Sequence, residues 1–420
     1  MGLLNSRRQL NCRVCGSERL QPYLNLGATP LANSYLREED LVSEEFREEL
    51  ALQVCLACGL SQLTVVVNPD LMFRNYLYVS STTETFRRHC VELAGTSTDV
   101  AGCRPGDLVL DIASNDGCLL SKFRDRGMRI VGVDPAENLA VEANKAGIPT
   151  VCAYWSVEAA EAVVCRFGQP RIVTATNVLA HADDVHGFVG SVVRCLAPRG
   201  IFVVECPYIV DFIEKNEFDT VYHEHLSYFG IHPLRVLMNR HRLSIFNVQY
   251  FEDIHGGTIR VFVARDGDYP LDPSVAIYLK NEEAFGIKDP NRYEAFGRRV
   301  LINRHNLLDL VGRLHGERKV VWAYGASAKG NTLMNYFGIS KDLVPVAVDD
   351  NPKKRGFYTP GSHMRITGID ELARSRVDYL LLLAWNFEAE IIRRCRAVGY
   401  AGGFIRPVPE AGFVDGGGDS

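Results

Sequence analysis

Four consecutive residues, Tyr222-His223-Glu224-His225, bring a phenol, two imidazoles and a carboxylate together. An imidazole has an unperturbed pKa of about 6.5 and can accept a proton near neutral pH, and a neighbouring carboxylate can orient it or tune its pKa. The cluster therefore predicts proton transfer. Its histidines lie two residues apart, rather than four as in the HExxH motif of zinc proteases. A metal shared by His223 and His225, and packing or capping roles for part of the cluster, are the alternatives.

Asn177 and His181 lie in a second polar segment, 177–184, which directly follows a β-rich run. In a doubly wound sheet, the residues just beyond the carboxyl ends of parallel strands face the ligand crevice. We therefore expect both side chains to point toward a bound cofactor or substrate. The Tyr222 cluster follows the next strand along the chain, so both polar groups are expected at one crevice.

A strand at 108–112 carries Asp111 near its end and runs into a turn of small residues. Small side chains let the backbone approach a ligand, and the turn places amide N–H groups beneath it. The turn has neither the GxGxxG pattern of a dinucleotide site nor the lysine of a P-loop. Asp134, 23 residues after Asp111, ends the next strand and can accept both ribose hydroxyls of an adenosine. An α/β domain that binds no nucleotide is the alternative.

This order of Asp-terminated strands resembles motifs I and II of the class I methyltransferases. The resemblance implies S-adenosylmethionine as the cofactor, with Asp111 and the turn facing its amino-acid portion. The residues expected to hold it are Asp111, Ser114, Asn115, Asp116, Gly117, Asp134, Pro135 and Asn177.

Two cysteine pairs, Cys12-x-x-Cys15 and Cys55-x-x-Cys58, have the spacing with which a tight turn grips one metal ion, and a glycine follows each pair. Four thiolates form a closed tetrahedral zinc site with no position for water, so the metal is expected to be structural rather than catalytic. The 39 residues between the pairs predict a folded insert. Packed or redox-active cysteines are the alternative.

The segment Gly325 to Gly330 follows a strand at 320–324 and leads into a helix, with Lys329 inside it. Backbone amides at a helix N-terminus and one lysine form a local anion site suited to the diphosphate of a sugar nucleotide. Ser327 stands where a dinucleotide fingerprint has its second glycine, which weakens the alternative of an NAD site. A glycine-rich packing turn is the other alternative.

The elements that must position these groups fall into three regions that differ in sequence pattern. Residues 1–75 contain the cysteine pairs and predict a small zinc-binding domain. Residues 76–270 alternate short β-rich runs with helical stretches, which is the rhythm of a parallel sheet, and end in a pair of strands that resembles an antiparallel edge. The expected strands are 108–112, 130–134, 172–177, 200–205, 243–250 and 258–264.

Residues 271–410 begin with an amphipathic helical stretch at 275–315 and continue with a second βα series, with strands expected at 320–324, 344–349 and 379–385. Residues 411–420 are expected to be a flexible glycine-rich tail. The predicted fold is α/β, with an N-terminal zinc-binding domain, a class I methyltransferase Rossmann-like core and a C-terminal Rossmann-like α/β domain.

Composition excludes several classes of partner. The 420-residue chain has a formal net charge of −5, with 47% hydrophobic and 23% charged residues. It lacks the positive field that holds nucleic acid or an anionic membrane, so neither is expected as a partner. No run approaches the ~18–20 apolar residues that span a bilayer. We expect a cytoplasmic protein whose eight other cysteines are reduced and packed.

Over nearly its whole length, the chain resembles the sugar C-methyltransferases of antibiotic deoxysugar pathways. The resemblance rests on the four-cysteine set and on segments 111–117, 177–184, 222–225, 255–257 and 325–332. It implies three domains, the last of which helps to bind a dTDP-linked sugar. It also implies His225 as the base, with Tyr76, His181, Tyr222 and Glu224 around the reacting sugar. Substrate contacts are expected from Gly325, Ser327, Lys329, Asn331, Thr332, His255 and Gly256.

The chain departs from the family at Ala113 and Ser327, where glycine and proline are more usual. These substitutions bear on the local geometry of the two loops. Tyr76 and Tyr78 lie two residues apart, and the sequence does not choose which of them reaches the active site.

A ketone acidifies the C–H bonds beside it, so a base can generate an enolate whose carbon attacks a sulfonium methyl group. The prediction is therefore methyl transfer from S-adenosylmethionine to the carbon alpha to the ketone of a dTDP-4-keto-6-deoxysugar. Position C-3 is preferred over C-5 because the family more often uses it. N- or O-methylation of a small metabolite, and a non-catalytic zinc-containing nucleotide-binding regulator, are the alternatives. A monomer or a weak homo-oligomer is expected.

Overall fold

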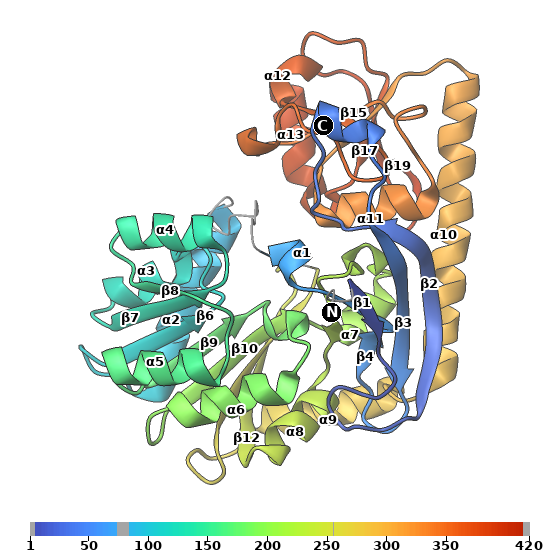
Figure 1. Cartoon of the computed structure of the whole chain (residues 1–420). Coiled ribbons are helices and arrows are strands. Elements are labelled where there is room, and N and C mark those ends of the chain that lie inside the picture. Colours follow the sequence, from blue (N-terminus) through green and yellow to red (C-terminus); the bar gives the residue numbers. More distant parts are fainter. Residues whose placement is uncertain (1–4, 74–83, 255, 415–420) are drawn as a thin grey trace, which may run out of the picture.

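The computed structural model describes residues 5–73, 84–254 and 256–414. These residues form a four-stranded, a seven-stranded and a six-stranded sheet, together with a two-stranded ribbon. Each large sheet belongs to a different part of the chain, and helices pack around the two larger ones (Figure 1). The predicted α/β fold class is confirmed.

The N-terminal zinc-binding domain is built on an antiparallel sheet with strand order β11-β4-β3-β2. Its last strand, β11 (Ser227–Tyr228), comes from the middle of the chain and pairs with β4. A ribbon of β1 and β5 lies beside the sheet. The domain's own elements are β1 (Ser6–Arg8), β2 (Leu20–Pro30), η1 (Glu38–Val42), β3 (Arg47–Cys55), β4 (Ser61–Leu63), β5 (Val65–Val67) and α1 (Asp70–Phe73).

The central sheet has the strand order β12-β13-β10-β9-β6-β7-β8, in which β13 runs antiparallel between β10 and β12. This is a doubly wound sheet with an antiparallel edge, as predicted. All five residues of β6 are buried, because helices cover both faces and leave no polar side to the strand. The strands are β6 (Leu108–Ile112), β7 (Arg129–Asp134), β8 (Thr150–Cys152), β9 (Ile172–Thr176), β10 (Ile201–Pro207), β12 (Leu243–Phe251) and β13 (Thr258–Arg265).

Helices and short 3-10 turns connect these strands. The crossover connections between neighbouring parallel strands are helical, as such connections require. The connecting elements are α2 (Glu84–Ala101), α3 (Cys118–Asp125), α4 (Glu137–Lys145), α5 (Val157–Phe167), η3 (Leu179–His181), α6 (Val185–Cys195), α7 (Ile209–Glu214), η4 (Phe218–Thr220) and α8 (Ile231–Arg240).

The C-terminal domain is a second doubly wound sheet, with the order β16-β15-β14-β17-β18-β19. The strand order reverses between β14 and β17, so the loops after these two strands flank the switch point where such sheets bind ligands. Its elements are β14 (Val321–Tyr324), α11 (Ala328–Phe337), β15 (Val346–Val348), η5 (Pro352–Lys354), β16 (Arg365–Thr367), α12 (Ile369–Leu372), β17 (Tyr379–Leu382), η6 (Trp385–Phe387), α13 (Glu388–Ala397), β18 (Gly403–Arg406) and β19 (Gly412–Val414).

Two helices replace the single helical stretch expected at 275–315: α9 (Pro273–Phe285) and α10 (Pro290–Gly316). Each begins with an aspartate cap followed by proline, and Gly286, with φ of 82°, ends the first. The long α10 runs beside β2 (Figure 1). A Cβ at Gly297 would lie 2.5 Å from the Tyr23 carbonyl oxygen, so glycine permits this close approach.

Most expected strands agree with the structure to within two residues at their ends, and 108–112 matches in full. The strand expected at 379–385 is shorter, because a 3-10 turn begins at Trp385. The flexible tail expected from residue 411 is wrong for Gly412–Val414. These residues pair antiparallel with β18, whose backbone groups they satisfy.

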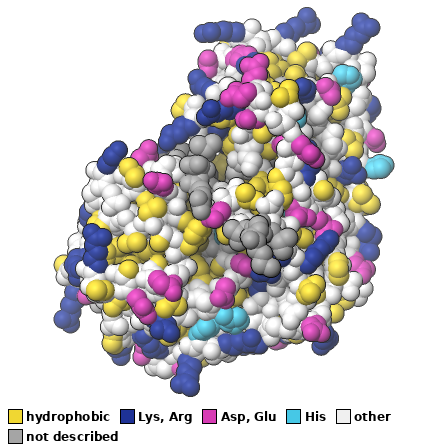
Figure 2. Space-filling view, viewed as in Figure 1, with side chains coloured by type: hydrophobic (Ala, Val, Ile, Leu, Met, Phe, Trp, Pro, Cys, Tyr) yellow, Lys and Arg dark blue, Asp and Glu magenta, His cyan; other side chains and the backbone are white. Residues whose placement is uncertain are grey.

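Positive and negative side chains are interspersed over the face seen in Figure 2, so this face carries no extended surface of one sign. Among the described residues, no helix combines the length and the apolar character needed to cross a membrane.

Candidate active site

His225 has a fixed tautomer. Its Nδ1 lies 2.9 Å from the Thr220 carbonyl oxygen, and its Nε2 lies 2.8 Å from the Tyr222 hydroxyl. A carbonyl can only accept a hydrogen bond, so Nδ1 must carry the proton. Nε2 therefore has the lone pair, to which Tyr222 donates. An imidazole oriented in this way presents a base toward the side on which Tyr222 lies.

His181 lies against His225, with ring centroids 4.9 Å apart and the rings nearly perpendicular. It ends the short turn η3 and also contacts the ring of Phe73 in α1. Burial lowers the pKa of His181 to about 4, against a weaker opposing effect of the Asn177 backbone. At neutral pH the ring is uncharged, so it can donate one N–H bond without adding a positive charge. The segments after β9 and β10 thus bring these two rings together.

Glu224 and His223 both contact the N-terminal domain. The Asn33 side-chain amide donates to Glu224 Oε1 at 2.6 Å, and the ring of His223 donates to the Glu48 carbonyl oxygen at 3.2 Å. Burial lowers the pKa of His223. No third metal ligand joins His223 and His225, because the four cysteines are the one group of three or more potential ligands that converges among the described residues.

The buried neutral state of His181 gives a pH-dependent stability. Between pH 6.5 and about 4, the unfolded chain binds a proton that folded His181 does not, so the free energy of unfolding falls as the pH decreases through this window. Replacing His181 with Gln should flatten that part of the profile, measured by denaturant unfolding at stepped pH. The same change at exposed His305 should leave the slope unchanged. An unaltered slope for His181→Gln would contradict the assignment.

The cofactor loop connects β6 to α3 through an unusual backbone. Ala113, Asn115 and Gly117 have φ angles of 58°, 51° and 77°. The left-handed conformation at Ala113 explains why glycine suits this position, and a Cβ at Gly117 would come within 2.5 Å of Ile148. The loop is therefore folded tightly at the carboxyl end of β6, where the Ala113 N–H donates to the Val133 carbonyl oxygen at 2.7 Å.

Asp111 and Asp134 lie close together at the ends of β6 and β7. Asp134 accepts the backbone N–H groups of Asn115 and Ala136, both at 2.8 Å, which leaves further lone pairs for hydroxyl donors. Asp111 accepts from the Thr174 hydroxyl at 2.6 Å. Burial, with the negative charge of Asp134 nearby, raises the pKa of Asp111 to about 7.

Within the described part of the chain, two buried polar atoms beside this loop have no hydrogen-bond partner: Ser114 Oγ and Asn177 Oδ1. Asn177 has φ of 54° and is held by its own N–H, which donates to the Glu205 carbonyl oxygen at 2.9 Å. A buried polar atom without a partner is costly, and a polar ligand would satisfy it. The loop, the two aspartates and these two atoms therefore fit S-adenosylmethionine, which carries ribose hydroxyls, an amine and a carboxylate.

The four cysteines of the two pairs converge. The Sγ atoms of Cys12, Cys15, Cys55 and Cys58 all lie within 4.8 Å of one another. The Sγ atoms of Cys12 and Cys58, and those of Cys15 and Cys55, are 3.5 Å apart. Tetrahedral zinc with bonds of about 2.3 Å needs sulfur atoms roughly 3.8 Å apart, so the set fits the ion. Gly16 and Gly59 follow the pairs with φ of 75° and 82°, which closes each knuckle.

Comparison with known proteins follows the same division of the chain. Three family models match it: a putative zinc binding domain over residues 12–73, a methyltransferase domain over 86–245, and a C-methyltransferase C-terminal domain over 253–409. A curated relative, the C-methyltransferase NovU of Streptomyces niveus, is 37% identical over 401 residues, which is 95% of each chain.

The chain belongs to the C-methyltransferase family. It is an S-adenosylmethionine-dependent C-methyltransferase, and its cofactors are S-adenosylmethionine and a structural zinc ion, as the motifs predicted. The family that the sequence resembled is thereby confirmed.

Two solved methyltransferase structures each match less than half of this C-methyltransferase. Magnesium protoporphyrin IX methyltransferase of Synechocystis PCC 6803, with bound SAM, is 12% identical and covers 43% of this chain and 79% of its own, with a TM-score of 0.33. A methyltransferase of Clostridium acetobutylicum is 14% identical and covers 43% of this chain and 92% of its own, with a TM-score of 0.35.

The loop after β14 forms the N-terminus of α11 in this C-methyltransferase. The side chain of Ser327 caps the helix, accepting from the Gly330 N–H at 3.2 Å. A Cβ at Gly325 would lie 2.9 Å from Ala384 after β17, so glycine lets the two loops meet. Asn331 and Thr332 are buried and donate across domain boundaries, to the Ala32 carbonyl at 2.7 Å and the Val221 carbonyl at 3.0 Å. Their described contacts thus join domains.

Lys329 lies next to carboxylates that sequence reasoning missed. Its Nζ is buried without a hydrogen-bond partner and lies 5.9 Å from the Trp385 ring centroid. The lysine charge acts on the buried carboxyls of Glu217 and Asp219, and Trp385 donates to Asp219 at 2.7 Å. Burial, only partly offset by Lys329, raises the pKa of Glu217 to about 7. The predicted anion site therefore has acidic groups beside its lysine.

Two expected site residues fall outside the described part of the chain, namely Tyr76 and His255. Tyr78 lies there too, so the choice between the two tyrosines is not made. Gly256 is described, and a Cβ there would come within 2.0 Å of Glu217 Oε1, so only glycine fits against this carboxylate.

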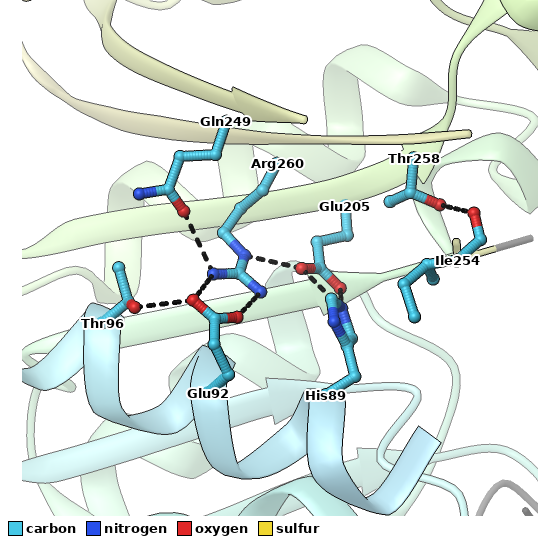
Figure 3. Close-up of polar contacts among 8 residues, drawn as sticks. All are labelled: His89, Glu92, Thr96, Glu205, Gln249, Ile254, Thr258 and Arg260. Atoms are coloured by element: carbon cyan, nitrogen blue, oxygen red, sulfur yellow. Dashed lines mark hydrogen bonds and ion pairs between the residues drawn. The ribbon is translucent and has the colours of Figure 1, made fainter. Parts of the chain in front are cut away.

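A buried ionic network fixes α2 to the central sheet (Figure 3). Arg260 of β13 is fully buried and bonds to Glu205 of β10 at 2.6 Å and to Glu92 of α2 at 2.6 Å. His89 of α2 lies 3.0 Å from Glu205. Burial would raise the pKa of Glu205, but the contacts with His89 and Arg260 outweigh it and leave the pKa below its ordinary value. Glu205 also holds Asn177 through its carbonyl, so the network supports the cofactor crevice.

The two carboxylates of this network should differ in their effect on stability. Glu205 has a side-chain exposure of 2% and Glu92 of 45%. Glu205→Gln leaves buried Arg260 with neutral Gln249 and with one carboxylate, the partly exposed Glu92, and we expect a loss of about 3 kcal/mol in the free energy of unfolding. Glu92→Gln should cost under about 1 kcal/mol. Urea unfolding of both variants measures this, and equal losses would show that burial does not govern the network.

Proposed function

We propose that the protein methylates the carbon beside the ketone of a dTDP-4-keto-6-deoxysugar, in a deoxysugar pathway of antibiotic biosynthesis. The observation that carries the proposal is the tautomer of His225, whose Nδ1–H is committed to Thr220 and whose Nε2 holds the lone pair. Carbon methylation needs a base to remove a C–H proton, whereas an amine is already nucleophilic. The curated relative, named a C-methyltransferase, supports carbon as the acceptor.

His225 is the proposed base. When bound, S-adenosylmethionine supplies an electrophilic methyl group. His225 Nε2 accepts the proton from the carbon beside the ketone, and the electron pair of that C–H bond moves toward the carbonyl oxygen to form the enolate. The imidazolium keeps its Nδ1–H bond to Thr220, which disperses its charge. Methyl transfer from the bound cofactor to the enolate carbon would break the carbon–sulfur bond of the donor, leave S-adenosylhomocysteine and restore the ketone, while the abstracted proton stays on His225.

Tyr222 and His181 are the proposed donors to the enolate oxygen. Before substrate binds, the Tyr222 hydroxyl occupies the lone pair of His225. We expect it to turn to the developing oxyanion, which frees Nε2 for the proton. Neutral His181 can donate its N–H to the same oxygen. Aimed donors of this kind contribute about 3–4 kcal/mol to transition-state stabilisation.

Glu224 is proposed to lie beside the sugar, held there by Asn33 of the N-terminal domain. The dTDP portion is proposed to lie at the switch point of the C-terminal sheet, near the α11 N-terminus and Lys329. Position C-3 is preferred over C-5. Tyr76 and His255 remain predicted site residues without structural description.

Two groups of residues complete the proposal. Cofactor contacts are assigned to Asp111, Ser114, Asn115, Asp116, Gly117, Asp134, Pro135 and Asn177. Substrate contacts are assigned to Gly325, Ser327, Lys329, Asn331, Thr332 and Gly256, with His255. The buried atoms without partners at Ser114, Asn177 and Lys329 support both groups.

The test is product analysis with a ¹³C-methyl donor. A panel of dTDP-4-keto-6-deoxysugars is incubated with the pure protein, and NMR locates the label. We expect a C–CH₃ signal at C-3. A methoxy or N-methyl product would overturn the proposal, and label at C-5 would correct its position.

Deuterium uptake separates the base from the methyl transfer. In D₂O without methyl donor, the keto-sugar should gain deuterium at the carbon that is later methylated. Binding of the sugar nucleotide without either exchange or methyl transfer would show that this keto-sugar is not the substrate.

A further inference from the structure

The first zinc knuckle is the turn from Cys12 to Cys15. Each residue from Arg13 to Cys15 forms a hydrogen bond to the methyltransferase core. Arg13 donates from Nη1 to Asp183 at 3.1 Å. The Val14 carbonyl oxygen lies 2.9 Å from His186 Nε2, and the Cys15 carbonyl accepts from Arg240 at 2.7 Å. The knuckle is therefore docked along its whole turn.

Asp183 is the contact closest to the chemistry, because it lies two residues after His181. It falls in the link between η3 and α6. Its neighbour Asp184 caps α6, accepting from the Gly187 N–H at 2.8 Å. The segment between η3 and α6 is thus held by two successive residues. Asp184 bonds to its own domain, and Asp183 bonds to the zinc knuckle.

The second knuckle, Cys55 to Cys58, is connected to the segment that contains His225 by the pairing of two strands. β4 begins three residues after Cys58, and β11 begins two residues after His225. Ser227 pairs with Gln62, and the Leu63 N–H donates to the Leu226 carbonyl at 3.1 Å. Gln62 also accepts the Arg13 N–H at 3.0 Å, which joins β4 to the first knuckle.

We propose that the zinc-binding domain sets the distance between the rings of His181 and His225. In this proposal, Arg13 is a positioning residue that holds the segment containing His181 through its bond to Asp183. One metal ion closes both knuckles, and each knuckle holds one histidine segment. The separation of 4.9 Å between the two rings is then decided by the N-terminal domain. This inference rests on the proposed catalytic roles of these histidines.

The environment of Arg13 fits positioning better than stabilisation. Its side chain is 1% exposed, and its Nε and Nη2 atoms have no hydrogen-bond partner. Burying a guanidinium with so few partners costs desolvation energy, and an apolar side chain of similar volume would avoid that cost. Asp183 is 42% exposed and also binds Arg7, which lies at the surface. What Arg13 alone provides is a directed bond from the knuckle to the link after His181.

The test compares Arg13→Met with the wild type in the zinc-loaded full chain. A displacement of about 1 Å at a catalytic group can lower turnover about 10²-fold, so we expect kcat to fall by about 10- to 100-fold. KM for S-adenosylmethionine should stay within about twofold, because Asn177 at the start of the segment keeps its N–H bond to Glu205. Zinc content should be unchanged, because no cysteine is replaced. Hydrogen exchange in 177–184 should become faster.

Further variants test whether Arg13 acts through Asp183. Asp183→Asn should reproduce the loss of kcat, and the double variant should lose no more than either single change. Arg13→Lys should recover part of kcat. Arg8→Gln removes an exposed ion pair from the same N-terminal ribbon and should leave kcat and exchange unchanged.

Three outcomes would overturn the inference: kcat of Arg13→Met within twofold of wild type, unchanged exchange in 177–184, or loss of zinc together with kcat. The last would assign Arg13 to folding of the metal domain. If the proposed function is wrong, the results differ in one respect: His181→Gln keeps full turnover. Hydrogen exchange in 177–184 of Arg13→Met then still decides whether Arg13 positions this segment.

Discussion

Replacing His225 with Gln is expected to lower kcat by about 10³-fold, within the range that a general base contributes. Glutamine keeps a polar side chain of similar length, but its amide cannot accept the C–H proton. Deuterium uptake into the keto-sugar should disappear with it. Steady-state kinetics with the methyl donor and NMR of the sugar in D₂O measure the two losses.

Tyr222→Phe tests the role of the Tyr222 phenol separately from that of His225 as the base. The phenol donates to Nε2 in the free enzyme, so its removal leaves the lone pair of His225 in place. Deuterium uptake should therefore persist in this variant but slow together with methyl transfer, because both pass through the enolate whose oxygen has lost a donor. Exposed His315→Gln is the matched control and should behave as wild type. Exchange at the wild-type rate in His225→Gln would remove His225 from its role as the base. Exchange and methyl transfer both at wild-type rates in Tyr222→Phe would remove Tyr222 from its role as a donor to the enolate oxygen.

Cys55→Ser is expected to abolish zinc binding and to unfold the N-terminal domain. Structural zinc in small domains is worth about 10–16 kcal/mol of binding energy, which is also folding energy. Since β4 pairs with β11 beside His225, the loss should reach the active site and remove methyl transfer as well. Metal analysis of the purified protein, with thermal unfolding, measures the effect.

The matched control is Cys152→Ser, which changes an exposed cysteine outside the metal group. It should keep zinc, the unfolding temperature and activity. A Cys55→Ser protein that retained its zinc and unfolded at the wild-type temperature would show that the four sulfurs do not act as one site.

Local pattern was enough to predict the elements of the central sheet. The run 108–112 is entirely apolar apart from Asp111, and a strand buried on both faces needs such a run. The boundary between α9 and α10 was missed although its signals are present, since Asp289 and Pro290 form a helix start after Gly286. The short β19 was missed because a glycine-rich end has no apolar pattern, and its pairing depends on β18.

The sequence by itself determined the metal group, the cofactor loop and the histidine cluster, because each is written in residues near one another along the chain: two CxxC pairs, an Asp-terminated strand with a small-residue turn, and four consecutive polar residues. Only the tertiary structure decided which of these groups meet. Asn33 binds Glu224 across 191 residues, and Arg13 binds Asp183 across 170. Such contacts arise when whole faces of sheets and helices pack together, and hydrophobic periodicity reports that a face is buried without naming its partner.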